Sequence, residues 1–113
     1  RSPARRHRET DVTAKVRHVW HQMHADGFVH DGSDSALDAF VAKITVRLNH
    51  GKGIASLAWC RGDTLMTVLE SLKQWHLREM TAVLSPRDLA FLDHRGYNAI
   101  NDLFTRKVRK VRV

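Results

Sequence analysis

The segment TLMTVLESLKQWHLRE, residues 64–79, carries the clearest indication of the fold. Its apolar side chains recur at steps of three and four residues, which places them along one side of a helix. These residues are Leu65, Val68, Leu69, Leu72 and Trp75. The side-chain oxygen of Asp63 or Thr64 can accept a hydrogen bond from a free backbone N–H group at the start of that helix. We therefore predict a helix over residues 64–79 with one buried side.

Two segments closer to the N-terminus have the same periodicity. The first covers residues 11–26, and its apolar stripe consists of Val12, Val16, Val19, Trp20 and Met23. Gly27 follows this segment and can end the helix. Residues 30–35 are turn formers. After them, a second stripe consists of Leu37, Phe40, Val41, Ile44 and Leu48.

Residues 54–60 form a short apolar segment between the second and third helices. Periodicity over so few residues cannot decide between an extended segment and a helical turn. In both arrangements we expect Ile54, Leu57 and Trp59 to be buried. A lone cysteine in an apolar run is typical of a small core residue rather than a nucleophile, and we expect this of Cys60.

Two further helices are predicted in the last third of the chain. Residues 85–94 open with Ser85-Pro86-Arg87-Asp88, in which serine can cap the helix, proline takes the first helical position and an acid follows. After Gly96, a last helix has an apolar side that consists of Tyr97, Ile100, Leu103, Phe104 and Val108. No stretch of useful length alternates as a strand does.

These patterns predict an all-α protein, a compact bundle of about five short helices with basic, flexible ends. We expect a flexible basic arm over residues 1–9, because this stretch is rich in arginine and lacks apolar periodicity. We expect a helical core over residues 10–80. A C-terminal helical hairpin with a basic tail is expected over residues 81–113.

Length and composition exclude several classes of protein. The chain has 113 residues, of which 42% are hydrophobic and 27% charged, as in one globular domain rather than a disordered chain or a two-domain enzyme. No apolar run approaches the roughly 18 residues that a membrane span needs, and no secretory signal is visible. The single cysteine excludes an intramolecular disulfide and a multi-cysteine zinc site, and it favours a reducing cytoplasm. Because the chain begins with Arg1, we expect it to be a fragment or a processed piece.

The formal net charge of +7 is concentrated at the two ends of the chain. Residues 1–9 hold four arginines against one glutamate, and residues 106–112 hold five basic residues and no acid. Between them, residues 10–105 hold ten basic and eleven acidic side chains and are nearly neutral. Basic ends attract polyanions such as nucleic acid, because they neutralise phosphates and release counterions. The alternative is that they only keep a fragment soluble or mark where a longer protein was cut.

Residues 85–112 are the best candidate for direct contact with DNA. A helix, a glycine-containing turn and a second, basic helix have the outline of a helix-turn-helix motif. The second helix directs asparagine and arginine, which read base edges, away from its apolar side. The predicted nucleic-acid-binding residues are Arg5, Arg6, Arg8, Asn98, Asn101, Arg106, Lys107, Arg109, Lys110 and Arg112. The alternative is a helical hairpin that packs on the core and ends in a solvated basic tail.

Little in the chain points to catalysis or metal binding. His18, His21 and His24 stand at steps of three in the first helix, close enough to share a metal ion. Their places beside the apolar stripe favour exposed histidines without a metal, so a metal-dependent function is only a third hypothesis. No paired carboxylates suited to acid–base chemistry are evident. We predict that the protein is not an enzyme and has no catalytic residues, metal-binding residues or cofactor.

Four short motifs, taken in order, resemble those of a known family. They are Lys15-Val16-Arg17-His18-Val19-Trp20, Met23-His24-Ala25-Asp26-Gly27, Ser35-Ala36-Leu37-Asp38-Ala39-Phe40-Val41 and Val68-Leu69-Glu70-Ser71-Leu72-Lys73-Gln74-Trp75. Their order and spacing over residues 15–79 are similar to those of the GemA / gp16 regulatory proteins of Mu-like phages and prophages. The resemblance implies a phage early-region protein that modulates host gene expression and DNA topology, and it implies no catalytic motif. It says little about residues 80–113.

The residues and the resemblance together predict a non-enzymatic regulatory protein of a Mu-like prophage. We expect it to bind DNA through its basic ends, mainly at phosphates. Its expected location is the cytoplasm of a bacterial host cell, at the nucleoid if it binds DNA, and not a membrane. The alternative is a protein–protein adaptor that docks on a host component of replication or transcription.

Overall fold

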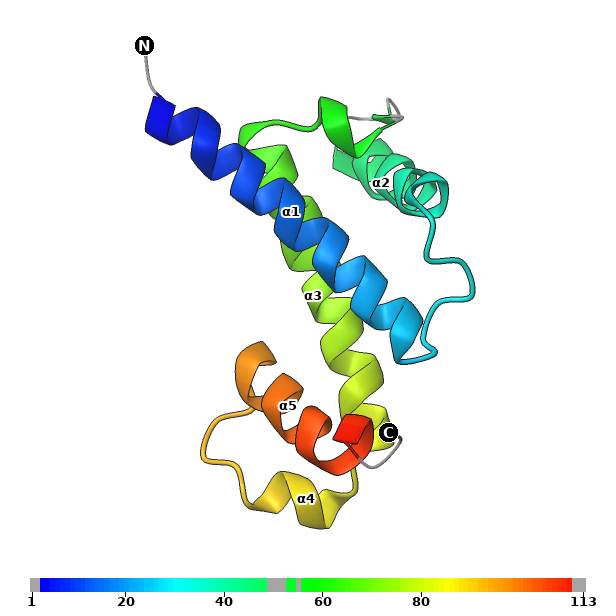
Figure 1. Cartoon of the computed structure of the whole chain (residues 1–113), viewed down its shortest axis with the longest axis vertical. Coiled ribbons are helices and arrows are strands. Elements are labelled where there is room, and N and C mark those ends of the chain that lie inside the picture. The colour runs from blue at the N-terminus through cyan, green and yellow to red at the C-terminus, as the bar shows by residue number, and fades with distance from the viewer. Residues whose placement is uncertain (1–2, 49–52, 55, 111–113) are drawn as a thin grey trace. The chain divides into compact units, whose positions relative to one another are not determined.

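The computed structural model describes residues 3–48, 53–54 and 56–110 of the chain. Every regular element in these ranges is helical and none is a strand, which confirms the predicted all-α fold (Figure 1). The elements are α1 (Pro3–Ala25), α2 (Asp34–Leu48), the 3₁₀-helix η1 (Leu57–Trp59), α3 (Gly62–Val83), α4 (Pro86–Ala90), α5 (Tyr97–Phe104) and the π-helix η2 (Thr105–Arg109). None of the described helices combines the length and the apolar character needed to cross a bilayer.

The chain forms two compact units, residues 1–72 and residues 73–113. The division falls inside α3, whose first part belongs to the first unit and whose last part belongs to the second. The ranges expected for domains, 10–80 for the core and 81–113 for the hairpin, stay predictions.

Helix α1 begins at Pro3, so the arm expected to be flexible over residues 1–9 is helical from residue 3 onward. Proline is tolerated in the first turn of a helix, because its missing N–H would have no partner there. Alanine and arginine, which follow it, are strong helix formers. These backbone preferences outweigh the lack of an apolar stripe in this stretch.

The other end of α1 follows the predicted stop at Gly27. This glycine has a φ of 87°, in the left-handed region that favours glycine. The Phe28 N–H donates to the Met23 carbonyl at 2.8 Å, and the Gly27 N–H donates to the His24 carbonyl at 3.0 Å. This pair of bonds is a Schellman-type cap, and it brings the half-buried Phe28 back alongside the helix.

The first unit has its core between α1, α2 and the first part of α3 (Figure 1). The ring centroids of Trp20 and Phe40 lie 5.8 Å apart, which joins α1 to α2. The buried apolar residues of this unit, each at most 9% exposed, are Val16, Val19, Trp20, Met23, Val29, Leu37, Val41, Leu57, Cys60, Leu65, Val68, Leu69 and Leu72. Burial of one aliphatic side chain contributes about 1.5–3 kcal/mol. Apolar packing therefore stabilises this unit.

Two side chains of α2 fix the chain before and at the start of η1. The Thr45 hydroxyl accepts from the Ile54 N–H at 2.7 Å, and Asp38 Oδ1 accepts from the Leu57 N–H at 2.9 Å. The sequence left open whether this segment is extended or helical, and η1 shows that it contains a 3₁₀ turn.

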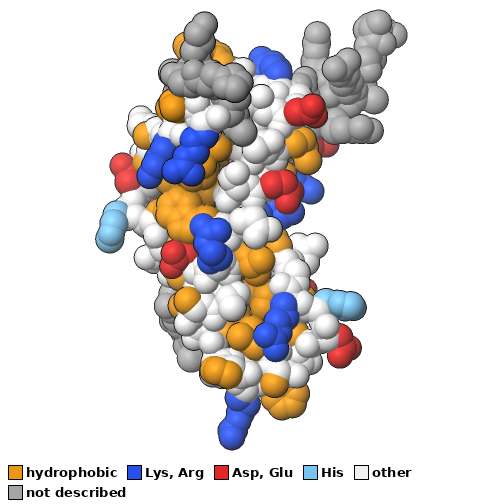
Figure 2. Space-filling view, turned by 180° about the vertical axis from the view of Figure 1, so that it is seen from behind, with side chains coloured by type: hydrophobic (Ala, Val, Ile, Leu, Met, Phe, Trp, Pro, Cys, Tyr) orange, Lys and Arg blue, Asp and Glu red, His pale blue; other side chains and the backbone are white. Residues whose placement is uncertain are grey.

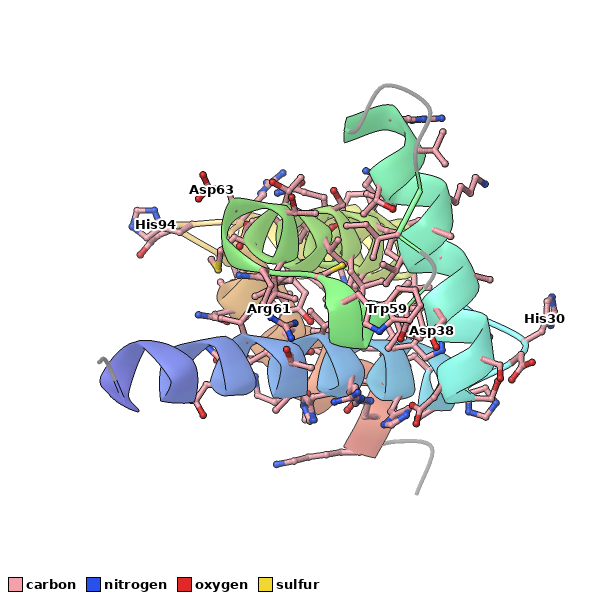
Figure 3. All side chains as sticks on the ribbon, turned by 90° about the horizontal axis from the view of Figure 1, so that it is seen from above. His30, Asp38, Trp59, Arg61, Asp63 and His94 are labelled. Atoms are coloured by element: carbon pink, nitrogen blue, oxygen red, sulfur yellow. The ribbon has the colours of Figure 1, made fainter. Side chains whose placement is uncertain are left out.

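The prediction that Trp59 is buried is wrong, because its side chain is 68% exposed while Leu57 and Cys60 are buried (Figure 3, where Trp59 and Asp38 are labelled). A 3₁₀-helix has three residues per turn, so Leu57 and Cys60 share one side and Trp59 is turned away. Burial raises the pKa of the Cys60 thiol, and the Arg61 guanidinium opposes that shift. Cys60 is a buried core residue, as predicted.

The second unit is built from the last part of α3 together with α4, α5 and η2. Figure 1 shows α5 and η2 beside the last part of α3. The buried residues of this unit are His76, Met80, Leu84, Ile100, Leu103 and Phe104. All of them except His76 are apolar, so one buried polar ring lies in an otherwise apolar core.

Helix α4 begins as predicted and ends early. Ser85 Oγ accepts from the Asp88 N–H at 3.1 Å, and Pro86 stands in the first turn. The helix ends at Ala90, although we expected it to continue to residue 94. No residue of α4 is buried, so apolar packing does not stabilise further turns of so short a helix.

The hydrogen bond between Asp38 and the Leu57 N–H helps to hold η1 in place, and so we expect it to protect the buried Cys60 thiol from reagents in solution. Asp38→Ala removes the acceptor, so we expect a loss of about 1–3 kcal/mol in stability and a faster reaction of Cys60 with a thiol reagent. Asp38→Asn keeps a side-chain oxygen there and should retain most of the protection. Labelling rates at fixed pH test this, and equal rates for Asp38→Ala and the unchanged chain contradict it.

Candidate nucleic-acid interface

α5 runs directly into η2, and this helical segment carries five of the predicted nucleic-acid-binding residues, with a sixth, Lys110, as its C-cap. Its buried side consists of Ile100, Leu103 and Phe104. Its exposed side chains recur mostly at steps of four residues. They are Asn98, Asp102, Arg106, Lys107 and Lys110. The segment is amphipathic, as predicted, and its cations gather in the last turns.

Three cationic side chains, Arg106, Lys107 and Lys110, are exposed at the end of this segment. Lys107 Nζ lies 3.8 Å from Asp88 Oδ1 of α4, and the Lys107 side chain remains 54% exposed. A surface ion pair of this kind contributes at most about 1 kcal/mol. The pair therefore costs little to break, and all three cations can meet a phosphate.

Asn101 and Arg109, both predicted to contact DNA, are hydrogen-bonded to each other. Arg109 donates to Asn101 Oδ1 at 2.6 Å and to Thr105 Oγ1 at 2.7 Å. The guanidinium carbon of Arg109 also lies 5.0 Å from the centre of the Phe104 ring. Both Asn101 and Arg109 are half-buried. Asn101 Oδ1 and the Arg109 guanidinium are thus engaged within the second unit.

His76 extends this network into the core of the second unit. Its side chain is fully buried, with Nδ1 2.7 Å from the Tyr97 hydroxyl and Nε2 3.5 Å from the Arg109 guanidinium. Because a guanidinium can only donate, Nε2 is placed to accept, and Nδ1 then carries the proton that is donated to Tyr97. Lys73 Nζ lies 5.3 Å from the centre of the Tyr97 ring.

Two residues of this site, His76 and Asp102, are not among the predicted nucleic-acid-binding residues. His76 stands four residues from both Leu72 and Met80, and that spacing is the signal that places it on the buried side of α3. Asp102 stands four residues before Arg106 and is exposed on the same row. Its carboxylate weakens the attraction of this row for phosphate.

α4 and α5 do not form a helix-turn-helix motif. α4 has only five residues, and residues 91–96 connect it to α5. The motif joins its helices through a shorter turn of about three or four residues. Since α4 buries no side chain, it has no packed position from which to hold a recognition helix.

The other predicted contacts fall on side chains outside the described part of the chain. These are Arg5, Arg6 and Arg8, whose backbone lies in α1, and Arg112. On the face drawn in Figure 2, the described Lys and Arg side chains are scattered among apolar and acidic ones and do not gather in one patch. The row on α5 and η2 is therefore the part of the predicted interface whose side chains the structure describes.

The histidines of α1 make contacts of a different kind. In the described ranges, no three metal-ligating side chains come together. His21 Nε2 lies 3.8 Å from Asp34 Oδ1 of α2. The ring of His24 lies so close to Gly32 that a side chain there would collide with it. These contacts place His21 beside the start of α2 and His24 against the loop before it.

The family model described as "Bacteriophage Mu, GemA protein" matches residues 1–78. The GemA protein of Escherichia phage Mu is 44% identical over 105 aligned residues, which cover 86% of this chain and 57% of that protein. The GemA protein of Escherichia phage D108 is 40% identical, with coverages of 96% and 64%. The Mu-like prophage FluMu protein gp16 of Haemophilus influenzae is 32% identical, with coverages of 70% and 42%.

The chain thus spans between 42% and 64% of the length of these relatives. The family match includes α1, α2, η1 and most of α3 and stops before α5 and η2. The similarity to the D108 protein covers 96% of the chain and so includes most of the second unit. No solved structure matches the chain significantly.

The bond between Tyr97 and His76 predicts an effect on stability. Tyr97→Phe removes the hydroxyl that partners Nδ1 of a buried imidazole, so we expect a loss of about 1–3 kcal/mol. The exposed neighbour Asn98 provides the control, since Asn98→Ala should change stability by less than about 0.5 kcal/mol. Chemical unfolding followed by circular dichroism measures both, and equal stabilities for the two variants contradict the expectation.

Proposed function

The chain belongs to the GemA family of Mu-like phage proteins, and we propose that it is a non-enzymatic regulatory protein that binds duplex DNA and modulates host gene expression. The observation that supports DNA binding is the exposed cationic end of α5 and η2, with Arg106, Lys107 and Lys110. Regulation by occupying DNA needs no catalytic group. In this proposal the protein acts in the bacterial cytoplasm, at the nucleoid.

Phosphate contacts dominate the proposed binding. Asn101 is bonded to Arg109, which leaves Asn98 as the exposed amide of the row that could read a base edge. Asp102, on the same row, repels the DNA backbone. The basic residues at positions 5–8 add further phosphate contacts. We therefore expect little sequence preference and a Kd of about 10⁻⁴–10⁻⁶ M at physiological salt, as for non-specific binding.

A protein–protein adaptor is the second candidate function, and two exposed aromatic side chains favour it. Trp59 is 68% exposed and Phe91 is 83% exposed. Aromatic residues are enriched at the centres of protein interfaces, and tryptophan especially carries much of their binding energy. In this alternative the protein docks on a host component of replication or transcription, and its cations contact an acidic surface of that partner.

Duplex affinity measured over a range of salt concentrations tests the first function. Arg106→Ala combined with Lys110→Ala should lower the slope of log affinity against log salt by about 0.9 for each phosphate that the variant no longer neutralises. The matched control, Lys43→Ala combined with Arg47→Ala, removes the same charge from exposed positions of α2 and should leave the slope nearly unchanged. The proposal fails if the unchanged chain binds no duplex at low salt, or if both double variants lower the slope equally.

Capture from nuclease-treated host lysate distinguishes the adaptor. If this alternative holds, a host protein remains bound to the immobilised chain after nuclease treatment. Trp59→Ala or Phe91→Ala then releases it without changing duplex affinity. Val46→Ala, at a less exposed apolar position, serves as the control. Loss of every captured protein after nuclease treatment rejects the adaptor and favours DNA.

A further inference from the structure

The Arg109 side chain is held from several directions within the second unit. It donates to Asn101 Oδ1 at 2.6 Å and to Thr105 Oγ1 at 2.7 Å. Its other terminal nitrogen lies 3.5 Å from His76 Nε2 and 3.8 Å from Met80 Sδ. The planar guanidinium suits this arrangement, because it presents several donors in fixed directions. An ammonium group on a flexible stem has no such fork.

The π-helical turn of η2 places Asn101, Thr105 and Arg109 along one side of the helix. In a regular α-helix, with about 3.6 residues per turn, residues eight apart such as Asn101 and Arg109 are rotated by about 80° about the axis. η2 instead closes bonds over five residues, and one of them joins the Lys110 N–H to the Thr105 carbonyl. The wider turn removes much of that rotation. Arg109 can therefore reach both Thr105 and Asn101 along one side of the helix.

We propose that Arg109 is a positioning residue. Its hydrogen bonds to Asn101 and Thr105, here called the clasp, stabilise the π-helical turn and so set the direction of the exposed cations. These cations are Arg106, Lys107 and Lys110. Asn101 is then the partner of this clasp and not a base-reading residue. The role of the cations rests on the proposed function, whereas the clasp itself does not.

A π-helical turn has to be stabilised by contacts with its surroundings. π-helical turns are rare, and an uncommon backbone conformation persists only where the surroundings hold it. If η2 relaxed to an α-helix, each residue after the turn would be displaced by up to about 100° about the axis. Arg106 and Lys110, four residues apart, would still share one face, but Lys110 would stand about 120° from Asn98 about the axis and so would leave the exposed row that Asn98 begins.

A direct contact between Arg109 and DNA would dismantle the same network. To reach a phosphate, the guanidinium must leave Asn101 and Thr105 and withdraw the donor that it offers to the buried His76. Arg106 and Lys110 can reach a phosphate without breaking these hydrogen bonds, because their side chains are already exposed. The geometry thus divides the basic residues of this segment into three that face solvent and one that holds the turn.

Arg109→Lys tests the clasp, because it keeps the positive charge and loses the fork. We expect amide hydrogen exchange over residues 105–110 to accelerate and duplex affinity at low salt to fall by about fivefold or more. If Arg109 instead binds phosphate directly, lysine replaces it with little change in either quantity. The matched control is Arg47→Lys, the same change at an exposed position of α2, which should alter duplex affinity by less than about twofold and leave exchange unchanged.

Asn101→Asp tests the other half of the clasp. A carboxylate accepts from Arg109 more strongly than an amide does, so exchange over residues 105–110 should be as slow as in the unchanged chain or slower. Duplex affinity should stay within about threefold. If Asn101 reads a base, the new negative charge faces DNA. A loss of more than about tenfold in affinity with unchanged exchange would therefore overturn its assignment.

Exchange and affinity separate this inference from the proposed function. If the unchanged chain binds no duplex at low salt, the proposed function fails, and exchange in Arg109→Lys still decides whether the clasp exists. Exchange over residues 105–110 as slow in Arg109→Lys as in the unchanged chain overturns the clasp at any affinity. Thr105→Val removes the hydroxyl that Arg109 contacts and keeps the shape of the side chain. It should also accelerate exchange, and it provides the test if Arg109→Lys does not fold.

Discussion

One row of side chains along α3 has to be buried, and one member of that row is polar. The row consists of Leu65, Leu69, Leu72, His76 and Met80, which recur at steps of three and four residues and are all buried. A buried imidazole must be hydrogen-bonded, since an unpartnered polar group in the core is costly. Tyr97 at the start of α5 and Arg109 at the end of η2 approach its two nitrogens. The placement of both ends of the C-terminal helical segment is therefore tied to a single side chain of α3.

Because Arg109 lies beside the buried His76, the basic residues near the C-terminus are not equally available to a binding partner. Residues 106–112 carry five formal positive charges, and counting them treats all five as equivalent. Arg106 and Arg109 stand three residues apart, yet the first is exposed and the second is half-buried among hydrogen-bond acceptors. The charge available to a partner is consequently smaller than the composition indicates, and Asp102 reduces it further.

The residues that could be predicted from the sequence are those in regular α-helices. The stripes of α1, α2 and α3 predicted most of the buried residues of the first unit, because their spacing matches about 3.6 residues per turn. Trp59 was misplaced where the backbone forms a 3₁₀ turn, and Arg109 was misplaced where it forms a π turn. The error at Arg109 comes from applying the α-helical period to a segment that has another, whereas Trp59 was expected to be buried in an extended or a helical segment alike, because its neighbours are apolar. Asp102 obeys the regular period and could have been identified. Its signal is the step of four residues to Arg106, which places both side chains on one exposed row.

The π turn also affects how this part of the chain can change in length. Such a turn accommodates one residue more than an α-helical turn, so loss of a single residue between Phe104 and Arg109 can be absorbed by a return to regular α-helix. The residues after the turn would then keep their directions, so Arg109 would stay next to the buried imidazole of His76 and Lys110 would stay exposed. A one-residue gap in an alignment of related chains at this point would therefore leave the inward-facing and outward-facing cations unchanged, whereas the same gap within a regular α-helix would rotate every later side chain by about 100° about the axis.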